Sequence, residues 1–140
     1  MNVYPYVNFD GRSDEAIEFY KGAIGAEVNV LMRYKDAPPQ SCAQGSITPG
    51  METKVMHAEL QIGESKVMLS DCHNKGDTKF AGISLTIAPA NDAQAAKIFG
   101  GLSSGGKICV PLNKTFFASS FGVVTDRFGV TWMVLVQPNR

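Results

Sequence analysis

The chain has 140 residues, a length typical of one domain, with 44% hydrophobic and 19% charged residues, as in an ordinary globular protein. Its 13 basic and 13 acidic residues cancel, which argues against the basic surface that nucleic-acid binding usually needs. The apolar runs are far shorter than the ~20 residues of a membrane helix, and the start MNVYPYVNFDG lacks the features of a signal peptide. We therefore expect a cytoplasmic protein without nucleic-acid or membrane partners.

The first predicted strand covers residues 3–9, where apolar and polar side chains alternate. Ser13 is the predicted N-cap of a helix, because apolar residues then recur every three or four positions as far as Gly25, which would end it. A further strand is predicted over Glu27–Tyr34. The first strand would turn a row of polar side chains away from the helix: Tyr4, Tyr6 and Asn8. This row could line a small-molecule pocket, or contact the other half of the chain or a second subunit.

Residues 35–54 form an unusually long predicted loop, either mobile or a functional lid. Alternation resumes over Val55–Ile62, and a glycine turn joins this strand to Lys66–Asp71 in a hairpin. His57 and Glu59 share the face opposite the apolar side chains. His57 is a candidate polar anchor, because imidazole changes charge near neutral pH, and either residue is a candidate catalytic base. The alternative is a histidine at a subunit interface or on a solvated face.

The second half repeats this order. A strand over Ile83–Ile87 leads to a helix over Asp92–Leu102, which Asn91 would cap, and a glycine-rich break follows at 105–106. Three more strands are predicted: Lys107–Leu112, Phe121–Thr125 and Val130–Val136.

The order β-α-β-β-β thus occurs twice, in pseudo-repeats of about 1–72 and 80–140, each too small to close a core alone. We predict an α+β fold: a single domain, 1–140, whose two modules form a curved, concave mixed sheet with the helices outside.

Three groups of segments, in this order over nearly the whole chain, resemble the PhnB-like branch of the vicinal oxygen chelate (glyoxalase/bleomycin-resistance) superfamily. They are PYVNFDG with AIEFYKGAIGAE, HAELQIG with VMLSD, and KTFFASSFGVVTDRFGVTWMV. The resemblance implies a glyoxalase-like fold and a homodimer, because two chains of this superfamily often complete each other's clefts. PhnB-like sequences are often described as demethylubiquinone methyltransferases, but this chain lacks the glycine-rich turn and acidic ribose ligand of a nucleotide-type cofactor site.

The resemblance also implies where a metal would bind. Members of the superfamily typically hold a divalent ion through His, Gln or Glu on the first and fourth strands of each half, and the ion acts as a Lewis acid. Carried over by position, these ligands fall on Tyr4 (or Pro5, although alternation favours Tyr4), at about Gly82, and on Met68 and Met133. None is a usual ligand for a hard or borderline ion. We therefore expect no metal and no cofactor at these positions, with the two methionines as apolar lining.

Three functions remain. The favoured one is metal-independent binding of an unidentified small molecule in an apolar cleft, because the chain offers apolar lining without an assembled catalytic constellation. The second is an enzyme of lyase, dioxygenase or transferase type with a remodelled site, and the third is a scaffold for dimerisation. Whether the chain is catalytic stays open. The predicted ligand-binding residues are Tyr4, Tyr6, Asn8, His57, Met68, Ser70, Phe117 and Met133.

Overall fold

The computed structural model describes residues 1–36, 50–71 and 79–138. The chain divides into two compact units, Met1–Thr78 (unit 1) and Lys79–Arg140 (unit 2), and each is described by itself. Most of the predicted loop at 35–54 lies outside the described residues. That the two units form one domain with a shared concave face stays a prediction.

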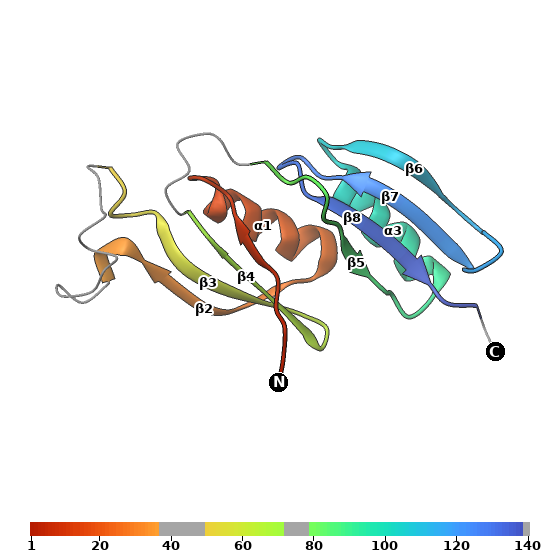
Figure 1. Cartoon of the computed structure of the whole chain (residues 1–140), viewed down its shortest axis with the longest axis horizontal. Helices are drawn as coiled ribbons and strands as arrows, with labels where there is room; N and C mark the ends of the chain where they lie inside the picture. Colours follow the sequence, from red (N-terminus) through yellow and green to blue (C-terminus); the bar gives the residue numbers. More distant parts are fainter. Residues whose placement is uncertain (37–49, 72–78, 139–140) are drawn as a thin grey trace. The chain divides into compact units, whose positions relative to one another are not determined.

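Unit 1 is a four-stranded mixed sheet with one helix (Figure 1). Its elements are β1 (Tyr6–Asn8), α1 (Ser13–Ile24), β2 (Glu27–Arg33), the short 3-10 helix η1 (Tyr34–Asp36), β3 (Val55–Ile62) and β4 (Ser65–Ser70). The strand order is β1-β4-β3-β2, in which β1 is parallel to β4 and the other pairs are antiparallel.

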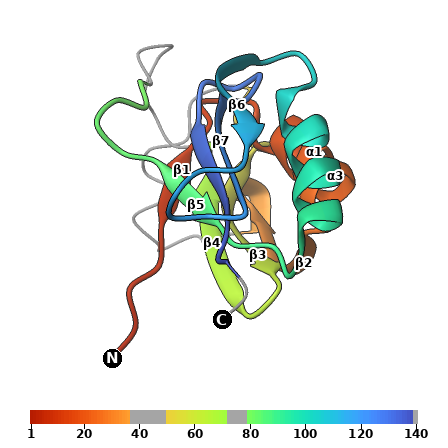
Figure 2. The same cartoon turned by 90° about the vertical axis from the view of Figure 1, so that its right-hand side faces the viewer.

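Unit 2 has the same topology, and Figure 2 shows its helix against the sheet of the same unit. Its elements are β5 (Leu85–Ile87), α3 (Asp92–Ser103), β6 (Lys107–Asn113), β7 (Ser120–Thr125) and β8 (Thr131–Val136). The order β5-β8-β7-β6 again contains one parallel pair, β5 with β8. The predicted α+β fold with the order β-α-β-β-β in each half is confirmed.

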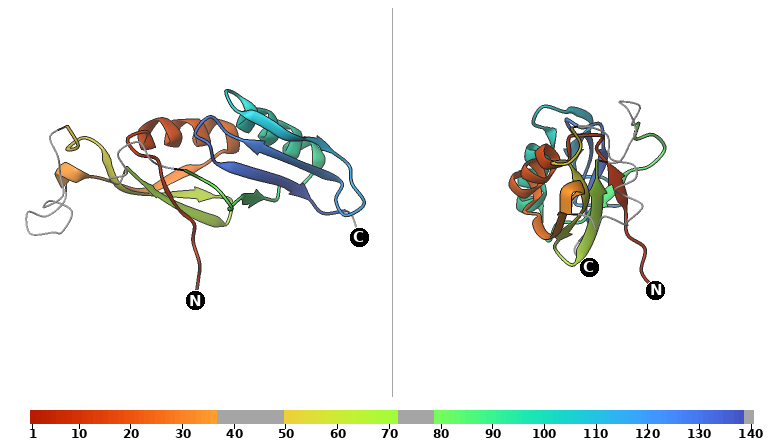
Figure 3. Two further views of the ribbon diagram at one scale, coloured as in Figure 1. Left: turned by 45° about the horizontal axis from the view of Figure 1, so that its top comes forward. Right: turned by 90° about the vertical axis from the view of Figure 1, so that its left-hand side faces the viewer.

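The core of unit 1 lies between α1 and one face of its sheet (Figure 3). Helix residues Ala16, Ile17 and Tyr20 are buried, as the helical spacing predicts. Ala58 and Leu60 of β3 and Leu69 of β4 are fully buried as well. Alternation then turns His57 and Glu59 to the opposite face, as predicted.

The core of unit 2 is built in the same way from α3 and strands β7 and β8. Trp132 and Val134 alternate along β8 and are both buried. Gly122 allows Phe99 of α3 to approach β7 closely, because an added Cβ would lie 2.6 Å from Cε2 of Phe99. A larger residue at this position would force the Phe99 ring away from the sheet.

Helix ends test the predicted caps. Asn91 accepts a 2.8 Å hydrogen bond from Gln94 N, and Gly25 has φ 69°, so both predictions are confirmed. The prediction for Ser13 is wrong: it is the first helical residue, and Arg12, which precedes it, makes no side-chain cap.

The first strand begins only at Tyr6, three residues later than predicted, and Val3 is 92% exposed. In the described part of the chain, neither helix has the length and apolarity that crossing a membrane requires.

Candidate functional site

The sheet face of unit 1 that α1 leaves uncovered gathers most of the predicted site residues. The strand register places Tyr6 opposite Met68 and Met68 opposite Glu59, so a phenol, a thioether and a carboxylate form one row across three strands. Neighbouring strands lie ~4.8 Å apart, so the row is about 10 Å long. We call this surface the open face of unit 1; its residues are Tyr6, Asn8, Glu27, Asn29, Val30, Met32, His57, Glu59, Gln61, Lys66, Met68 and Ser70.

Tyr6 and His57 form an aromatic pair on the open face of unit 1. Their ring centroids are 5.7 Å apart with an interplanar angle of 28°, and the Tyr6 hydroxyl lies 3.3 Å from His57 Nδ1. When the hydroxyl donates to Nδ1, the imidazole carries its proton on Nε2 and presents it as a donor. Tyr6 is 54% exposed, so most of its side chain remains available for contact.

Glu59 has a separate set of partners. The Asn29 amide donates to Glu59 Oε2 at 3.1 Å and to Gln61 Oε1 at 2.9 Å, and Lys66 Nζ lies 3.8 Å from the carboxylate. Asn29 reaches this face because the register of β2 shifts between Val28 and Val30, which indicates a β-bulge. The Glu59 side chain is only 17% exposed, so its charge is held in place by neighbours rather than fully solvated.

The predicted catalytic candidates share a face but are not joined. His57 is paired with Tyr6, whereas Glu59 is paired with Asn29, and no hydrogen bond links the two candidates in residues 1–36 and 50–71. A dyad is therefore not assembled in this structure. A role for either residue as a base stays a prediction.

The other predicted residues of unit 1 differ in accessibility. Tyr4 precedes β1 and is 39% exposed. Asn8 Oδ1 accepts from Asp10 N at 3.2 Å, so its carbonyl oxygen supports the turn after β1. Ser70 is 1% exposed and offers almost no surface to a ligand.

Met133 and Phe117 belong to unit 2. Met133 lies opposite Thr86 on β5 and Val123 on β7, and Phe117 packs edge-on against Phe121 with centroids 5.1 Å apart. This surface, the open face of unit 2, carries residues of all four strands: Thr86, Lys107, Cys109, Val110, Asn113, Phe121, Val123, Thr125, Thr131, Met133 and Leu135. Its part on β5, β7 and β8 is apolar except for hydroxyls, whereas the edge strand β6 adds Lys107 and Asn113. An apolar lining by Phe117 and Met133 stays a prediction. The open face of unit 1 is mainly polar.

The register also tests the metal positions that the resemblance implies. We align the parallel pair β1–β4 of unit 1 with the parallel pair β5–β8 of unit 2. Met68 then matches Met133, as predicted, and Tyr6 matches Thr86. Tyr4 matches Ser84 rather than Gly82. Thioethers and hydroxyls at these positions do not fit a hard or borderline divalent ion. In the described part of the chain, no three His, Cys, Asp or Glu side chains are grouped to hold a metal ion.

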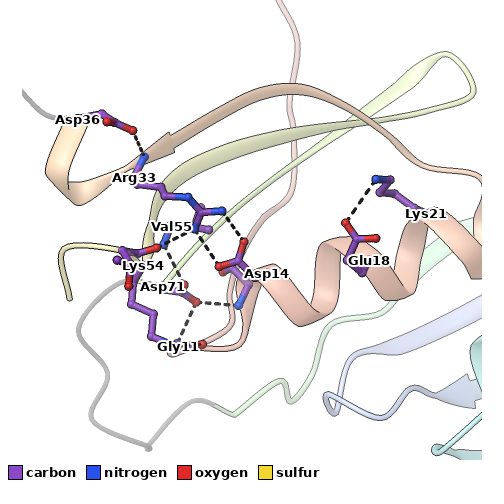
Figure 4. A network of polar contacts seen from close by, with 11 residues as sticks. Gly11, Asp14, Glu18, Lys21, Arg33, Asp36, Lys54, Val55 and Asp71 are labelled. Carbon is purple, nitrogen blue, oxygen red and sulfur yellow. Dashed lines mark hydrogen bonds and ion pairs between the residues drawn. The ribbon is translucent and has the colours of Figure 1, made fainter. Parts of the chain in front are cut away.

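A buried carboxylate positions the strand that carries His57 and Glu59 (Figure 4). Asp71 Oδ1 accepts from Gly11 N at 2.9 Å and from Ser13 N at 2.8 Å, and Oδ2 accepts from Val55 N at 3.0 Å. Asp71 thereby caps α1 and fixes the first residue of β3. Asp71 follows the last residue of β4, and it caps a helix that begins 58 positions earlier in the chain.

An ion pair lies beside this carboxylate. The Arg33 guanidinium donates to both oxygens of Asp14 at 2.9 Å, and this hydrogen bonding lowers the pKa of Asp14 and raises that of Arg33. Lys54 Nζ donates to Gly11 O at 3.0 Å. The polar contacts therefore hold the end of β2, the start of α1 and the start of β3 together.

Several residues of the open face of unit 1 were not among the predicted site residues: Glu27, Asn29, Val30, Met32, Gln61 and Lys66. Gln61 and Lys66 follow from the same alternation that places His57 and Glu59, so the signal was present in the sequence. Asn29 could not be found in this way, because it depends on the bulge in β2.

Comparisons with known proteins extend over the whole chain. Residues 1–135 match a family model described as 3-demethylubiquinone-9 3-methyltransferase. Protein YjdN of Escherichia coli (strain K12) is 32% identical over 149 residues, covering 100% of both chains. The crystal structure of protein PA1353 from Pseudomonas aeruginosa is 32% identical with a TM-score of 0.85, covering 99% of both chains. A glyoxylase/bleomycin resistance protein/dioxygenase domain from Frankia sp. EAN1pec has a TM-score of 0.70 at 11% identity, over 99% of this chain and 98% of that one, and shows the fold alone.

Proposed function

The chain belongs to the PhnB-like family, whose model is described as 3-demethylubiquinone-9 3-methyltransferase and whose fold is that of glyoxalase and bleomycin-resistance proteins, and from this membership we propose that it binds a small molecule on the open face of unit 1.

The observation that carries the proposal is the stacked Tyr6–His57 pair next to the Tyr6–Met68–Glu59 row. Small-molecule sites combine apolar and aromatic contact area with a few fixed polar groups that orient the ligand. Tyr6 and Met68 supply the apolar and aromatic contact area, and His57 and Glu59 supply the polar groups. The hydrogen bonds of Tyr6 and Asn29 hold both polar groups before any ligand arrives.

Methyl transfer, which the description of the family model names, finds little support in these residues. A nucleotide-type cofactor places its phosphates on the N–H groups at the start of a helix after the first strand. At the start of α1, the Asp71 carboxylate already accepts from the N–H groups of Gly11 and Ser13. A second anion there would be repelled.

The alternative is an enzyme of the same fold with a remodelled site, in which His57 is the base. It is favoured by one observation: the Tyr6 hydroxyl at Nδ1 orients the imidazole, as a second residue does in many catalytic sites. Replacement of His57 by Gln tests this alternative, because Gln keeps a hydrogen-bonding group at this position but cannot act as a base. Turnover of a bound ligand should then cease, whereas the affinity should fall only in part. Mass spectrometry of the ligand after incubation detects the turnover.

A homodimer in the cytoplasm is part of the proposal. Both faces of the edge strand β2 expose apolar side chains, with Val28, Leu31 and Met32 each about 40% exposed, and a second copy would remove this surface from water. Light scattering at micromolar concentration is expected to give the mass of a dimer, and a monomer would contradict this part.

Screening a fragment library against ¹⁵N-labelled full chain tests the binding function. Amide shifts are expected at Tyr6, His57 and Glu59, and Tyr6→Ala is expected to weaken any hit about tenfold, because an aromatic contact is lost. Glu18→Gln, on the exposed side of α1, is the control and should leave affinity unchanged. Hits that bind elsewhere, or that keep full affinity for Tyr6→Ala, would refute the proposed site.

A further inference from the structure

The amide donors around Glu59 on the open face of unit 1 are engaged within the protein. Asn29 uses both amide hydrogens, one for Glu59 and one for Gln61, and Gln61 Nε2 donates to Gly63 O at 2.8 Å. These contacts fix the Asn29 amide, because a flipped amide would point its oxygen at a carboxylate. Asn29 Oδ1 is consequently presented as an acceptor.

The acceptors of the same cluster are only partly used. Glu59 Oε2 accepts from Asn29, but no protein donor contacts Glu59 Oε1 in residues 1–36, 50–71 and 79–138. A carboxylate offers about four lone-pair directions, so capacity remains for a ligand that donates. Glu59 and Asn29 therefore offer acceptors to a ligand that donates.

The charged residues of the open face of unit 1 also favour a ligand that donates hydrogen bonds. The open face of unit 1 carries two acidic residues, Glu27 and Glu59, against one basic residue, Lys66. The Lys66–Glu59 contact of 3.8 Å involves a lysine that is 40% exposed, and such surface pairs hold weakly. An ammonium group that reaches Glu59 directly would form the shorter, charge-assisted contact.

The rest of the row fits an aromatic body. Tyr6 and Glu59 stand on either side of Met68, about 10 Å apart from strand to strand. A methionine sulfur makes favourable contacts with a ring above it, and the exposed Tyr6 ring attracts a cation or stacks on a second ring. A bicyclic ring over Met68 would bring an attached amine to Glu59.

We propose that the ligand of this face is a planar aromatic amine, bound with its ring over Met68 and beside Tyr6 and with its ammonium group on Glu59. This inference rests on the proposed function of the open face of unit 1 and adds the chemical class of the ligand.

Three probes of the same shape test the class: 1-naphthylmethylamine, 1-naphthylmethanol and 1-naphthoic acid. They are titrated into ¹⁵N-labelled full chain at low salt and neutral pH. The amine is expected to bind at least about tenfold more tightly than the alcohol, because its hydrogen bond to Glu59 is charge-assisted, and the acid is expected to bind most weakly. The shifted amides should include Tyr6, Glu59 and Met68.

Variants assign the selectivity to one carboxylate. Glu59→Gln should reduce the preference for the amine over the alcohol to about twofold or less, while Tyr6→Ala should weaken all three probes by a similar factor. Glu18→Gln, on the helix that covers the opposite face of the sheet, is the matched control and should keep the full preference. A preference that survives Glu59→Gln would overturn the inference.

The outcomes separate this inference from the proposed function. If the alcohol or the acid binds as tightly as the amine and shifts the same amides, the ligand class is wrong and the binding function stands. If none of the three shifts these amides, the ligand class is overturned, and the fragment screen decides the binding function.

Discussion

The two units share topology and register but differ on their open faces. On the helix side, both sheets bury apolar side chains, such as Leu69 in unit 1 and Val134 in unit 2. On the open side, the register matches Glu59 with Val123 and Gln61 with Thr125. Burial against the helix restricts one face of each sheet in the same way, whereas the other face has been free to acquire different chemistry. The polar groups of unit 1 are therefore not required by the fold, which makes them candidates for function.

The two units also differ in the partners of the acidic side chain at the start of the helix. In unit 1, the acidic residue Asp14 pairs with Arg33. In unit 2, its counterpart Asp92 accepts from the hydroxyls of Ser119 and Ser120 at 2.7 and 2.6 Å. An ion pair and a pair of hydroxyl hydrogen bonds respond differently to salt, so this difference is measurable.

The largest expected effect is at the buried aspartates. Asp71→Ala removes the acceptor of three backbone N–H groups and should lower the free energy of unfolding by about 3 kcal/mol or more. Asp126→Ala should cost a similar amount in unit 2, where the carboxylate accepts from Phe128 N, Val130 N and Trp132 Nε1.

Urea denaturation measures these losses, and hydrogen exchange locates them. Asp71→Ala should speed exchange in α1 and β3 first, and Asp126→Ala in the β7–β8 turn. Asp36→Ala is the control, because this exposed carboxylate accepts a hydrogen bond from Arg33 N at the surface, and its loss should cost less than about 1 kcal/mol. If either variant speeds amide exchange to the same extent in both units, the units do not unfold separately.

The second effect concerns one pair of matched core positions, Ala58 and Gly122. Gly122→Ala places a methyl group against Phe99 and should cost about 1–3 kcal/mol. Ala58→Gly should cost about 1 kcal/mol, because it adds backbone freedom and removes a small buried group. Phe99→Leu should be less damaging in the Gly122→Ala background than alone, which a double-mutant cycle by urea denaturation detects. Additive costs would mean that Phe99 is not the obstacle.

Local patterns explain how much of this could be predicted. Alternation and helical spacing predicted the elements of both units and the shared face of His57 and Glu59, because each depends only on neighbours in the chain. The match of Met68 with Met133 came instead from the resemblance to the superfamily.

The predictions from the sequence were wrong or incomplete where contacts between residues far apart in the chain determine the structure. Ser13 is not a cap, because Asp71 supplies the acceptor from the end of β4. The first strand is short because its ladder with β4 begins at Tyr6 and Met68. The partners of Glu59 were missed because a bulge turns Asn29 onto its face. None of these contacts leaves a periodic signal in the sequence.

A third, smaller effect is expected when an open-face residue is exchanged for its counterpart. Glu59→Val gives unit 1 the residue that unit 2 carries at Val123 and should change the free energy of unfolding by less than about 1 kcal/mol, because a hydrogen bond is lost while a strong strand former is gained. The same variant should lose the preference for the aromatic amine. A stability loss above about 2 kcal/mol in urea would instead assign the carboxylate to the fold.

The smallest expected effect comes from removing the charge of the acidic residue at the start of each helix. Asp14→Asn and Asp92→Asn keep the shape of each side chain and remove its charge. Hydrogen bonds from Arg33 lower the pKa of Asp14, and those from Ser120 and Ser119 lower the pKa of Asp92, each below the ordinary 3.8. A lowered pKa in the folded state stabilises the protein above the unfolded-state pKa, and this contribution is lost as the pH falls through the folded value. Both variants should therefore be less stable than the parent at pH 7, and the differences should vanish below pH 3.8.

Salt then separates the two carboxylates. The Asp14 side chain is 54% exposed, so its ion pair contributes less than about 1 kcal/mol and is screened at 1 M NaCl. The hydroxyl partners of Asp92 carry no net charge, so salt should change that difference much less. Urea denaturation at pH 7 in 0.05 and 1 M NaCl measures both, with the parent chain as reference. Equal salt sensitivity would mean that Asp92 is stabilised by a cation such as Lys114, the charged residue that also lowers its pKa, and that the two units start their helices by the same physical means.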